Sequence, residues 1–487
     1  MSSTKNEIIS GITYSAISKY LGIAISLIVT GILARLISPA DFGVVAIATV
    51  LIIFFGMLSD LGIAPAIIQK KDLNKNELTD IFSFTMWTAL ITSVCFFLFS
   101  WVIADYYDAP ILVPICQLLS VNLFFSALNI VPNALLLKNK EFRFIAFRSL
   151  IVQFIGGAIS VIAALYGAGL YALLINPIFS SIIIFTINFK KHPLKLKRTF
   201  GLASMRKIYQ FSSYQFFFNI INYFSRNLDK LLIGKYLNLS ALGYYEKSYR
   251  LMMLPLQNIT HVITPVMHPV FSEFQNDLKH LSWSYLRIVR LLAFIGFSLS
   301  TFLWFTAREL IVLIFGTQWD ASVPVFQILS LTVGIQIILS TSGSIFQAAN
   351  DTKSLFISGL LSAILSITGM MIGIFIFKSL EAVAWSISFS FLINFIQCYV
   401  LMYKFTLKLS MLPFWRQFIS PVTLCLILTV LLFFGSKLTH DLDFLISFFI
   451  KAFLSLVIFI CYIQFSKEYN ILEKVRSLTI LNSSTKK

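Results

Sequence analysis

The fold of this chain is constrained first by its apolar runs, which reach about twenty residues or more and recur along almost its whole length. A helix of about 20 apolar residues crosses the roughly 30 Å of hydrocarbon in a bilayer. The 487 residues are 58% hydrophobic and only 12% charged, too few polar residues to cover the surface of a water-soluble protein. The sequence therefore predicts an all-α fold, a polytopic membrane protein whose long helices span the bilayer.

The apolar runs predict about fourteen spans, two sets of six followed by two more. They are expected at residues 11–37, 42–68, 77–104, 110–137, 143–166 and 169–189, then at 206–234, 241–271, 281–306, 322–348, 354–377 and 380–404, and finally at 416–436 and 444–465. The first span is too long for the core of a signal peptide, so we expect no cleavage.

A basic linker, KKHPLKLKR within residues 190–207, separates the two sets of six. We expect an N-terminal six-helix lobe at 1–189, a cytoplasmic linker at 190–207, a second lobe at 208–405, two peripheral helices at 406–466, and a cytoplasmic tail at 467–487 that lies in the interface as an amphipathic helix. A shift of 200 residues places Gly243 on Gly43 and Lys235 on Arg35. Because six is even, the lobes would be related by a pseudo-two-fold axis along the membrane normal, with a transport path between them.

The distribution of charge predicts the orientation. With the N-terminus inside, the inner segments and the tail hold most of the 38 Lys and Arg, which predicts cytoplasmic N- and C-termini. A basic inner face beside anionic lipid accounts for the net charge of +17, so no nucleic acid is expected as a partner. The five cysteines have neither disulfide nor metal-ligand spacing, and we expect no metal site and no cofactor.

Four predicted spans carry polar residues every three or four positions, which places them on one helix face. Such stripes either bond one helix to another or line a polar cavity. Their presence in corresponding spans of both halves favours a cavity. The stripes are Ser15, Lys19, Gly22, Ser26 and Thr30; Asn122, Ser126, Asn129 and Asn133; Gln215, Asn219, Asn222, Arg226 and the neighbours Asp229 and Lys230; and Gln336, Ser340, Ser344 and Gln347. Asn129, Asn219, Asn222 and Gln336 are the predicted lining residues.

The sharpest functional signal is a hairpin of two apolar helices joined near Asn238 that carries six charges. They are Arg226, Asp229, Lys230, Glu246, Lys247 and Arg250. An ionisable group at membrane depth normally faces a bundle interior or a wet cavity. Lys230 and Glu246 each lie eight residues from Asn238, and Arg226 and Arg250 each lie twelve, so an ion pair and two level arginines are expected. Paired guanidiniums suit a phosphate-bearing ligand, which predicts a cationic substrate cavity of Arg226, Arg250, Lys230 and Lys19.

Three acidic residues are candidates for a gate or for ion coupling. Lys19 and Asp60 fall at similar depth in the first hairpin, so they form either an inner gate or a structural ion pair. Asp229 and Glu246 either neutralise the arginines or, like Asp60, bind a proton or a sodium ion. Lys451, alone in the last span, is predicted to snorkel to the interface.

Several segments together carry a family resemblance. LARLISPADFG (33–43), SDLGIAPAIIQ (59–69), LDKLLIGKYLNLSALGYYEKSYRLMMLPLQ (228–257), MHPVFSEFQND (267–277) and FGTQWDASVP (315–324) resemble the Wzx and teichuronic-acid type of polysaccharide exporter. This type belongs to the multidrug/oligosaccharidyl-lipid/polysaccharide exporter superfamily. The likeness covers nearly the whole chain.

The resemblance implies a flippase, not an enzyme, that moves undecaprenyl-pyrophosphate-linked oligosaccharide across the bacterial plasma membrane by alternating access. It further implies polysaccharide polymerases and glycosyltransferases as partners, and leaves proton or sodium coupling open. Two alternatives remain: a multidrug exporter of the same superfamily, which would favour an acidic cavity, and a membrane-bound sugar-modifying enzyme, which would need a convergent set of His, Asp or Glu. The five histidines form no such set.

Overall fold

The predicted all-α architecture is confirmed in the computed structural model. The structure describes residues 2–60, 62–70, 72–197, 220, 223–224, 227–439 and 441–466, and every regular element in these ranges is helical. The chain divides into two compact units: unit 1 comprises Met1–Glu246 and Ile314–Gln318, and unit 2 comprises Lys247–Leu313 and Trp319–Lys487. The lobe boundary predicted at 190–207 stays a prediction, because most of that linker lies outside the described residues.

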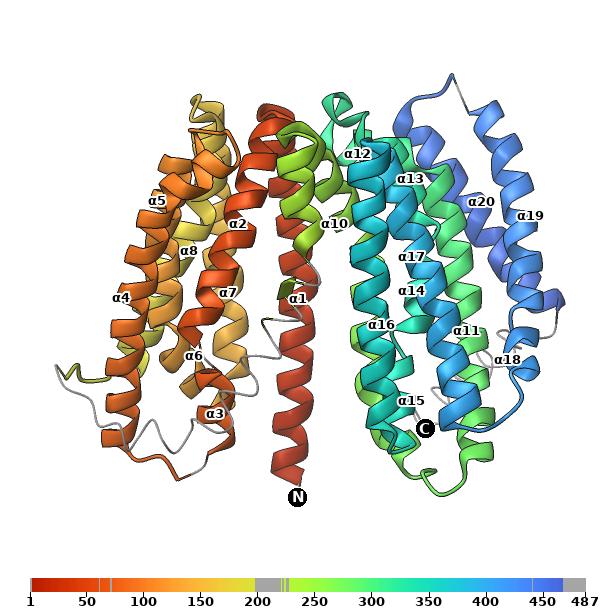
Figure 1. Cartoon of the computed structure of the whole chain (residues 1–487), viewed down its shortest axis with the longest axis horizontal. Coiled ribbons are helices and arrows are strands. Elements are labelled where there is room, and N and C mark those ends of the chain that lie inside the picture. The colour runs from red at the N-terminus through yellow and green to blue at the C-terminus, as the bar shows by residue number, and fades with distance from the viewer. Residues whose placement is uncertain are drawn as a thin grey trace, which may run out of the picture. The chain divides into compact units, whose positions relative to one another are not determined.

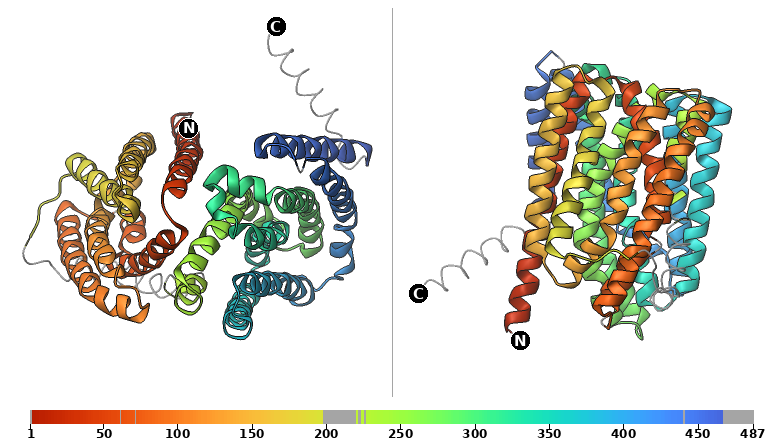
Figure 2. Two further views of the ribbon diagram at one scale, coloured as in Figure 1. Left: turned by 90° about the horizontal axis from the view of Figure 1, so that it is seen from above. Right: turned by 90° about the vertical axis from the view of Figure 1, so that its left-hand side faces the viewer.

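Unit 1 is built from helices that run side by side (Figure 1; Figure 2, right). They are α1 (Ser2–Leu36), α2 (Pro39–Asp60), α3 (Ile63–Gln69), α4 (Lys75–Tyr106), α5 (Leu112–Leu128), α6 (Ile130–Lys138), α7 (Phe142–Leu165), the 3₁₀ turn η1 (Gly169–Tyr171), α8 (Ala172–Lys191) and the first residues of α10 (Leu239–Ser272). In this unit α7 packs between α1 and α8, while α5 packs between α4 and α8 and is covered by α2.

Unit 2 contains the remainder of α10 and all later helices except for the few residues assigned to unit 1. These helices are α11 (Leu278–Phe305), α12 (Ala307–Phe315), η2 (Thr317–Trp319), α13 (Ser322–Ser330), α14 (Val333–Leu339), α15 (Ser342–Ala348), α16 (Thr352–Met371), η3 (Ile372–Phe377), α17 (Leu380–Leu401), η4 (Met402–Thr406), α18 (Leu412–Arg416), α19 (Ile419–Leu438) and α20 (Phe444–Phe465). Here α11 packs on α14 and α19, α17 packs on α16 and α13, and α19 packs on α20.

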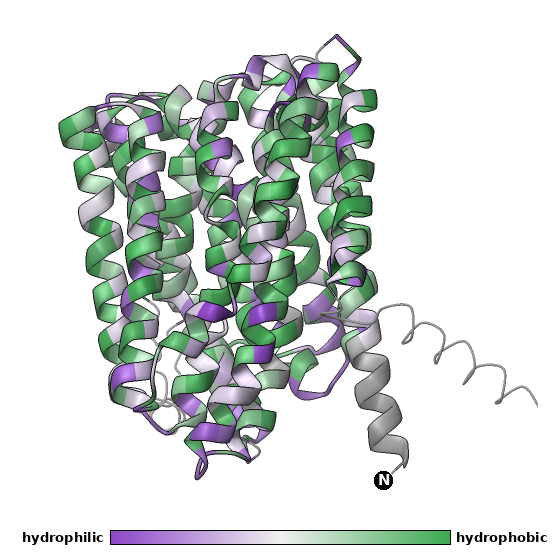
Figure 3. Ribbon diagram, turned by 90° about the vertical axis from the view of Figure 1, so that its right-hand side faces the viewer, coloured by the Kyte–Doolittle hydropathy of each residue, from purple (hydrophilic) through white to green (hydrophobic). Residues whose placement is uncertain are grey.

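The described helices include eleven that are long and apolar enough to span a membrane, and a twelfth if the bent pair 322–330 and 333–348 is one span. Hydrophobic residues dominate the lengths of these helices in Figure 3. The predicted count of fourteen is not confirmed: the span expected at 206–234 lies mostly outside the described residues, and α10 is not among the eleven.

Asn and Asp side chains cap the N-termini of several helices that follow loops. At the start of α4, the side chain of Asn74 accepts from the backbone N–H of Glu77 at 2.8 Å, and the Glu77 carboxylate accepts from the N–H of Asn74 at 2.9 Å. This capping box satisfies two N–H groups that would otherwise lack partners. Asp277 and Asp351 cap α11 and α16 more simply, since each side chain accepts from the backbone N–H three residues later, without a reciprocal bond.

Gly22, one member of the polar stripe of α1, and the nearby Ser18 bond α1 to α7. The Gln153 Nε2 of α7 donates to the carbonyl of Gly22 at 2.9 Å, and the Ser18 hydroxyl donates to the carbonyl of Ala146 at 3.3 Å. A methyl group added at Gly157 would meet Val29 at 2.7 Å, so the helices approach closely because this residue is small.

Two glycines that the 200-residue shift superimposes contact each other's helices reciprocally. Within unit 1, a Cβ atom at Gly43 would collide with the carbonyl oxygen of Leu239, and a Cβ atom at Gly243 would collide with the carbonyl oxygen of Pro39. The beginnings of α2 and α10 therefore cross at backbone contact, which only glycine permits. The weak sequence repeat corresponds to a real packing contact.

The end of α1 is held by residues far away in the chain. The Gln318 side-chain amide donates to the carbonyl of Ala34 and, at 3.2 Å, to the carbonyl of Ile37. These carbonyls lie in the last turn of a helix and just beyond it, where they have no intrahelical partner. Gly31 packs against the carbonyl of Ile314, and this contact explains why residues 314–318 belong to unit 1.

The loops before α7 and α16 repeat the same backbone geometry, at an offset of 210 residues. Lys140 and Asn350 adopt left-handed φ values of 58° and 54°. The next residue donates its N–H back to the preceding helix in each case, Glu141 to Leu136 and Asp351 to Phe346. A non-glycine residue rarely adopts this conformation, so its occurrence at matching positions supports an internal repeat.

An acidic residue in each loop contacts the end of a later helix, α8 in unit 1 and η4 in unit 2. Glu141 accepts from His192 at 2.8 Å and forms an ion pair with Lys191, and Asp351 accepts from the Thr406 hydroxyl at 2.6 Å. Partial burial acts to raise the pKa of the Glu141 carboxyl, but the bonds and charges of Lys191 and His192 outweigh it and hold that pKa below its ordinary value.

The core of unit 2 is a buried aromatic cluster. The hydroxyls of Tyr285 and Tyr399 lie 2.6 Å apart, and Tyr285 also bonds Thr341 at 3.0 Å. Phe414 stacks on Tyr399 with ring centroids 4.3 Å apart. The Tyr399 hydroxyl also donates to the carbonyl of Ile338 at 3.1 Å, next to the break between α14 and α15, so the cluster contacts the backbone where the span is broken.

Candidate functional site

The charged hairpin is only partly described. Arg226, Asn219 and Asn222 lie outside the described residues, so the predicted pair of level arginines stays a prediction. Arg250 is exposed on α10, whereas Glu246 and Lys230 are half-buried. Lys247, next to Glu246, is buried.

Asp229 is buried in unit 1 and is held by a neutral partner. The Tyr245 hydroxyl donates to its carboxylate at 2.8 Å, and the backbone N–H of Lys230 donates to the other oxygen at 2.8 Å. Sequence reasoning missed Tyr245, although it lies seven residues after Asn238 and Asp229 lies nine before it, a signal that the hairpin count could have used. The hydrogen bond between Tyr245 and Asp229 joins the two helices of the hairpin.

A cavity of about 360 Å³ in unit 1 brings together residues that the sequence had placed in separate hypotheses. Asp60, a gate or coupling candidate, lines it together with Asn122 and Ser126 from the polar stripe of the fourth predicted span. The remaining lining residues are Ile52, Ile53, Gly56, Met57, Gly62 and Leu123. The pocket therefore presents a carboxylate, an amide and a hydroxyl within an apolar wall.

The polar groups of this pocket are only lightly engaged. The Asp60 carboxylate accepts one long bond, 3.3 Å from the N–H of Ala64, and forms no ion pair with any described cation. The Asn122 amide donates to the carbonyl of Pro177 in α8 at 2.7 Å, which leaves its oxygen as an acceptor. Lys19 is exposed on α1 and makes no ion pair with Asp60, so the pair considered from the sequence does not form in this structure.

A second polar cluster in unit 1 centres on Arg148, which lies within the span predicted at 143–166. Its side chain is only 8% exposed, and its Nη1 donates to the side-chain oxygen of Asn188. The Asn188 amide in turn donates to the side chain of Asn129 at 2.7 Å. Asn129, predicted to line a cavity, is thus the end of a chain of side-chain hydrogen bonds. Its one sequence signal was its place in the polar stripe of the fourth predicted span.

Gln336 in unit 2 bonds the start of its own helix, α14, and contacts α10. Its amide donates to the Thr332 hydroxyl at 2.8 Å and lies 3.6 Å from the sulfur of Met252. Ser340, in the same stripe, accepts from Thr260 at 3.0 Å. These contacts favour the first explanation of this stripe, which joins the broken span of unit 2 to its neighbours.

The prediction that Lys451 snorkels to the interface is wrong. Lys451 is 5% exposed, forms an ion pair with Glu309 of α12, and donates to the carbonyl of Phe305 at 3.0 Å. The Ser447 hydroxyl also donates to Glu309, at 2.8 Å. The last predicted span contains a lysine because α20 docks on the junction of α11 and α12.

The comparison with known families matches a model described as polysaccharide biosynthesis protein to residues 32–324. The lipopolysaccharide biosynthesis protein WzxC of Escherichia coli (strain K12) is 27% identical over 379 residues, 76% of either chain. The teichuronic acid biosynthesis protein TuaB of Bacillus subtilis (strain 168) is 23% identical over 433 residues, 86% of this chain and 87% of the relative. The succinoglycan biosynthesis transport protein ExoT of Rhizobium meliloti (strain 1021) is 24% identical over 372 residues, 76% and 75% of the two chains.

Solved structures share the fold. The lipid II flippase MurJ in an inward closed conformation matches with a TM-score of 0.72 at 15% identity, over 93% of this chain and 98% of that chain. An inward-facing multidrug resistance transporter of the MATE family matches with a TM-score of 0.57 at 15% identity, over 79% and 96% of the two chains. At these identities the likeness concerns the fold alone.

Proposed function

Because this chain belongs to the polysaccharide biosynthesis protein family, we propose that it is a flippase for lipid-linked oligosaccharide. The family match, which covers more than half of the chain, is the observation that carries the proposal. The substrate would be an oligosaccharide repeat unit on undecaprenyl pyrophosphate, moved from the cytoplasmic to the outer leaflet of a bacterial plasma membrane. The chain is a multi-pass membrane protein, and N- and C-termini in the cytoplasm are part of the proposal.

The mechanism is alternating access with a cationic binding site. The lipid tail stays in the bilayer while the charged headgroup crosses, so the protein must hold a pyrophosphate where hydrocarbon cannot. Arg226, Arg250, Lys230 and Lys19 are the proposed cations, because guanidinium and ammonium groups bind phosphate oxygens with charge-assisted hydrogen bonds. The exposure of Lys19 and Arg250 supports this role, since neither side chain is enclosed in a packed core.

The pocket at Asp60 is the proposed site for the coupling ion. Its oxygen-bearing side chains would suit a proton or a sodium ion, and no described cation neutralises the Asp60 carboxylate. Asp229, bonded to Tyr245, is better explained as a structural group. Polysaccharide polymerases and glycosyltransferases would act on the two sides of this step as partners.

The test uses a strain that lacks the gene, and it measures surface glycan together with the sidedness of any accumulated lipid-linked oligosaccharide. We expect the intermediate on the cytoplasmic side. The wild-type gene should restore surface glycan, whereas Arg226→Ala and Arg250→Ala should restore little at normal protein levels. Arg308→Ala is the matched control, because Arg308 is well exposed and its partner Asp320 lies 3.8 Å away at the surface.

Other outcomes would support different functions. Unchanged surface glycan with increased sensitivity to a cationic drug would identify a drug exporter. A complete lack of lipid-linked oligosaccharide would place the protein earlier in the pathway, as an enzyme that builds it. Equal loss in Arg226→Ala, Arg250→Ala and Arg308→Ala would refute the cationic site while leaving the flippase proposal in place.

A further inference from the structure

Exposed tyrosines gather in unit 1 where the end of α4 meets the first helix of the charged hairpin. Tyr106, the last residue of α4, is 50% exposed, and Tyr236, at the end of the helical stretch 227–236, is 49% exposed. The two side chains interact with each other. Charged side chains surround them, and we call the whole group the tyrosine shelf: Asp105, Tyr106, Asp108, Lys235 and Tyr236.

The ring of Tyr106 is held in place by its neighbours. The Lys235 ammonium lies 5.1 Å from the centroid of this ring and forms an ion pair with Asp108 at 2.8 Å. A cation over the face of an aromatic ring is attracted to it. The Tyr107 ring meets that of Tyr106 edge-on at 5.1 Å, and the Tyr107 hydroxyl donates to the carbonyl of Leu231 at 3.2 Å. These contacts also join α4 to the hairpin.

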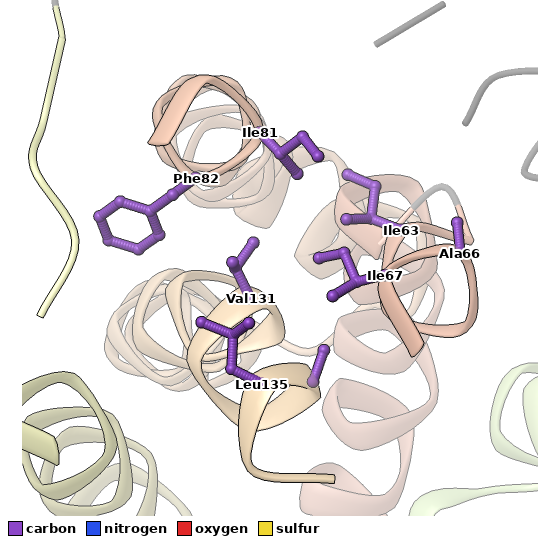
Figure 4. Close-up of a cluster of buried hydrophobic side chains, with 8 residues drawn as sticks. Ile63, Ala66, Ile67, Ile81, Phe82, Val131 and Leu135 are labelled. Carbon is purple, nitrogen blue, oxygen red and sulfur yellow. The ribbon is translucent and has the colours of Figure 1, made fainter. Parts of the chain in front are cut away.

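The helix that carries Tyr106 is anchored in the core of unit 1. Near the start of α4, Ile81 and Phe82 belong to a buried cluster with residues of α3 and α6, among them Ile67 and Val131 (Figure 4). The neighbouring helix α5 packs along α4. A binding residue on a packed helix is positioned more precisely than one on a loop, so the tyrosine shelf has a rigid support.

The exposed face of α4 shows where the hydrocarbon of the membrane ends. Phe97 and Trp101 are exposed on this face, and the next residue on it, Asp105, is an exposed carboxylate. Tryptophan is typical of the membrane–water interface, whereas a carboxylate facing hydrocarbon is costly. The tyrosine shelf therefore lies at the level of water, beyond the aromatic belt that Trp101 marks.

A half-exposed tyrosine ring in water presents a surface that suits a sugar. The face of an aromatic ring carries negative charge density, and the C–H groups on one face of a pyranose ring carry slight positive charge, so the two stack. The carboxylates of Asp105 and Asp108 accept hydrogen bonds from hydroxyl groups. Because the shelf has two carboxylates and one ammonium group, it favours a neutral sugar over an acidic one.

We propose that the tyrosine shelf binds a neutral sugar of the oligosaccharide on the outer side of the membrane. This inference rests on the proposed flippase function and on the proposed topology, which puts the end of α4 outside. The shelf gives the glycan a binding surface in water, separate from the cations that hold the pyrophosphate.

Sugar binding is measured by saturation-transfer NMR on the full-length protein in nanodiscs. The probes are oligosaccharides prepared by partial hydrolysis of the surface polysaccharide of the wild-type strain. Tyr106→Leu and Tyr236→Leu each remove a ring but keep an apolar side chain, whereas Tyr106→Phe and Tyr236→Phe keep the ring. Tyr166→Leu is the matched control, because Tyr166 is a strongly exposed tyrosine that directly follows another helix, α7.

We expect each Leu variant of the shelf to weaken binding by about fivefold, because a stacking contact is lost. Each Phe variant should bind more tightly than the corresponding Leu variant, and Tyr166→Leu should bind like the wild type. Melting temperatures should be unchanged, since the substituted side chains are half exposed or more. Equal binding by the wild type and both Leu variants of the shelf would overturn the inference, as would the same loss in Tyr166→Leu or no binding by the wild type.

The preference for a neutral sugar has its own measurement. The same oligosaccharides, with their primary alcohols oxidised to carboxylates, should bind more weakly than before oxidation, and Asp105→Asn should reduce the difference at low salt. Equal or tighter binding of the oxidised probes by the wild type would refute the assigned class of sugar.

The deletion strain tests the proposed function separately. A lipid-linked intermediate trapped on the cytoplasmic side, together with no binding by the purified protein, would overturn this inference alone. Binding at the shelf by a protein whose deletion leaves surface glycan unchanged would overturn the proposed function alone.

Discussion

At the scale of single residues, the pair of Glu309 and Lys451 shows how a charge can belong inside a membrane helix. Both side chains are buried, and Lys451 also donates to the carbonyl of Phe305, the last residue of α11. The lysine thus neutralises a carboxylate and satisfies a helix end at once. The contribution of Lys451 to stability depends mostly on Glu309, because an uncompensated charge at this depth is costly.

Removal of one partner should therefore be far worse than removal of both. We expect Lys451→Ala or Glu309→Ala alone to destabilise the protein by about 3–5 kcal/mol, and Lys451→Met with Glu309→Gln to cost much less. Thermal unfolding of the purified protein in detergent, followed for all variants as a double-mutant cycle, measures the difference.

The exposed pair of Arg308 and Asp320 provides the comparison. Because water screens it, Arg308→Ala should change stability by about 1 kcal/mol or less. Costs for Lys451→Ala and Glu309→Ala that simply add in the double variant would mean that the two buried groups do not interact energetically.

At the scale of elements, the sequence predicted where the helices are but not where they break. The hydropathy run through 42–68 is continuous, so nothing in it marks the end of α2. Gly62 was visible, yet glycine also occurs within intact membrane helices, because neighbouring helices can satisfy the freed backbone groups. The break becomes evident only with the packing of α3 on α6.

The candidate site was predicted unevenly for a related reason. Spacing along a helix correctly grouped Asn122 with Ser126, because both project from one face of α5 into the pocket. Spacing could not show that Arg148 is bonded in the interior of unit 1, since its partner Asn188, and Asn129 beyond it, come from other parts of the chain. Contacts between helices distant in sequence decide such cases.

The contacts of Glu141 with Lys191 and His192 predict that the stability of the protein depends on pH. The pKa of the Glu141 carboxyl is held below the ordinary value, so the unfolded chain takes up a proton at a higher pH than the folded one. Its contribution is therefore complete above the unfolded pKa of about 4.3 and is lost as the pH falls through the folded pKa. Near neutrality, Glu141→Gln should lower the free energy of unfolding by about 1 kcal/mol or less. Its melting temperature should therefore lie below that of the wild type near neutrality, and the two should converge in acid.

Asp351→Asn tests whether this behaviour is common to both loops. Partial burial acts to raise the pKa of Asp351 as well, but its bonds to Thr406 and Ser354 outweigh that effect and hold the pKa below its ordinary value. The same convergence in acid is expected. A gap between Glu141→Gln and wild type that widens as the pH falls would contradict the assigned sign.

At the scale of the whole molecule, the orientation in the membrane can be measured one loop at a time. With the native cysteines replaced, single cysteines at Tyr166 and Leu438, which are strongly exposed, should react with a membrane-impermeant maleimide added to intact cells. Cysteines at Asn139 and Ser410 should react only after the membrane is opened, because the basic segments are expected inside. The opposite pattern would invert the proposed topology.

Corresponding helices in the two halves of the chain are separated by nearly constant offsets in residue number. The beginnings of α2 and α10, Pro39 and Leu239, are 200 residues apart, and α4 and α11 end at Tyr106 and Phe305 with nearly the same offset. The helices that begin the fourth and tenth predicted spans, α5 and α13, start at Leu112 and Ser322, 210 residues apart, and that offset persists in the left-handed loop residues Lys140 and Asn350.

If an ancestral gene was duplicated, the later insertion is thus the stretch that forms α12 and the turn after it. This stretch supplies Glu309, which anchors the last helix, and Gln318, which caps the first. A stretch without a counterpart in the first half thus supplies one contact to each unit, to α1 in unit 1 and to α20 in unit 2.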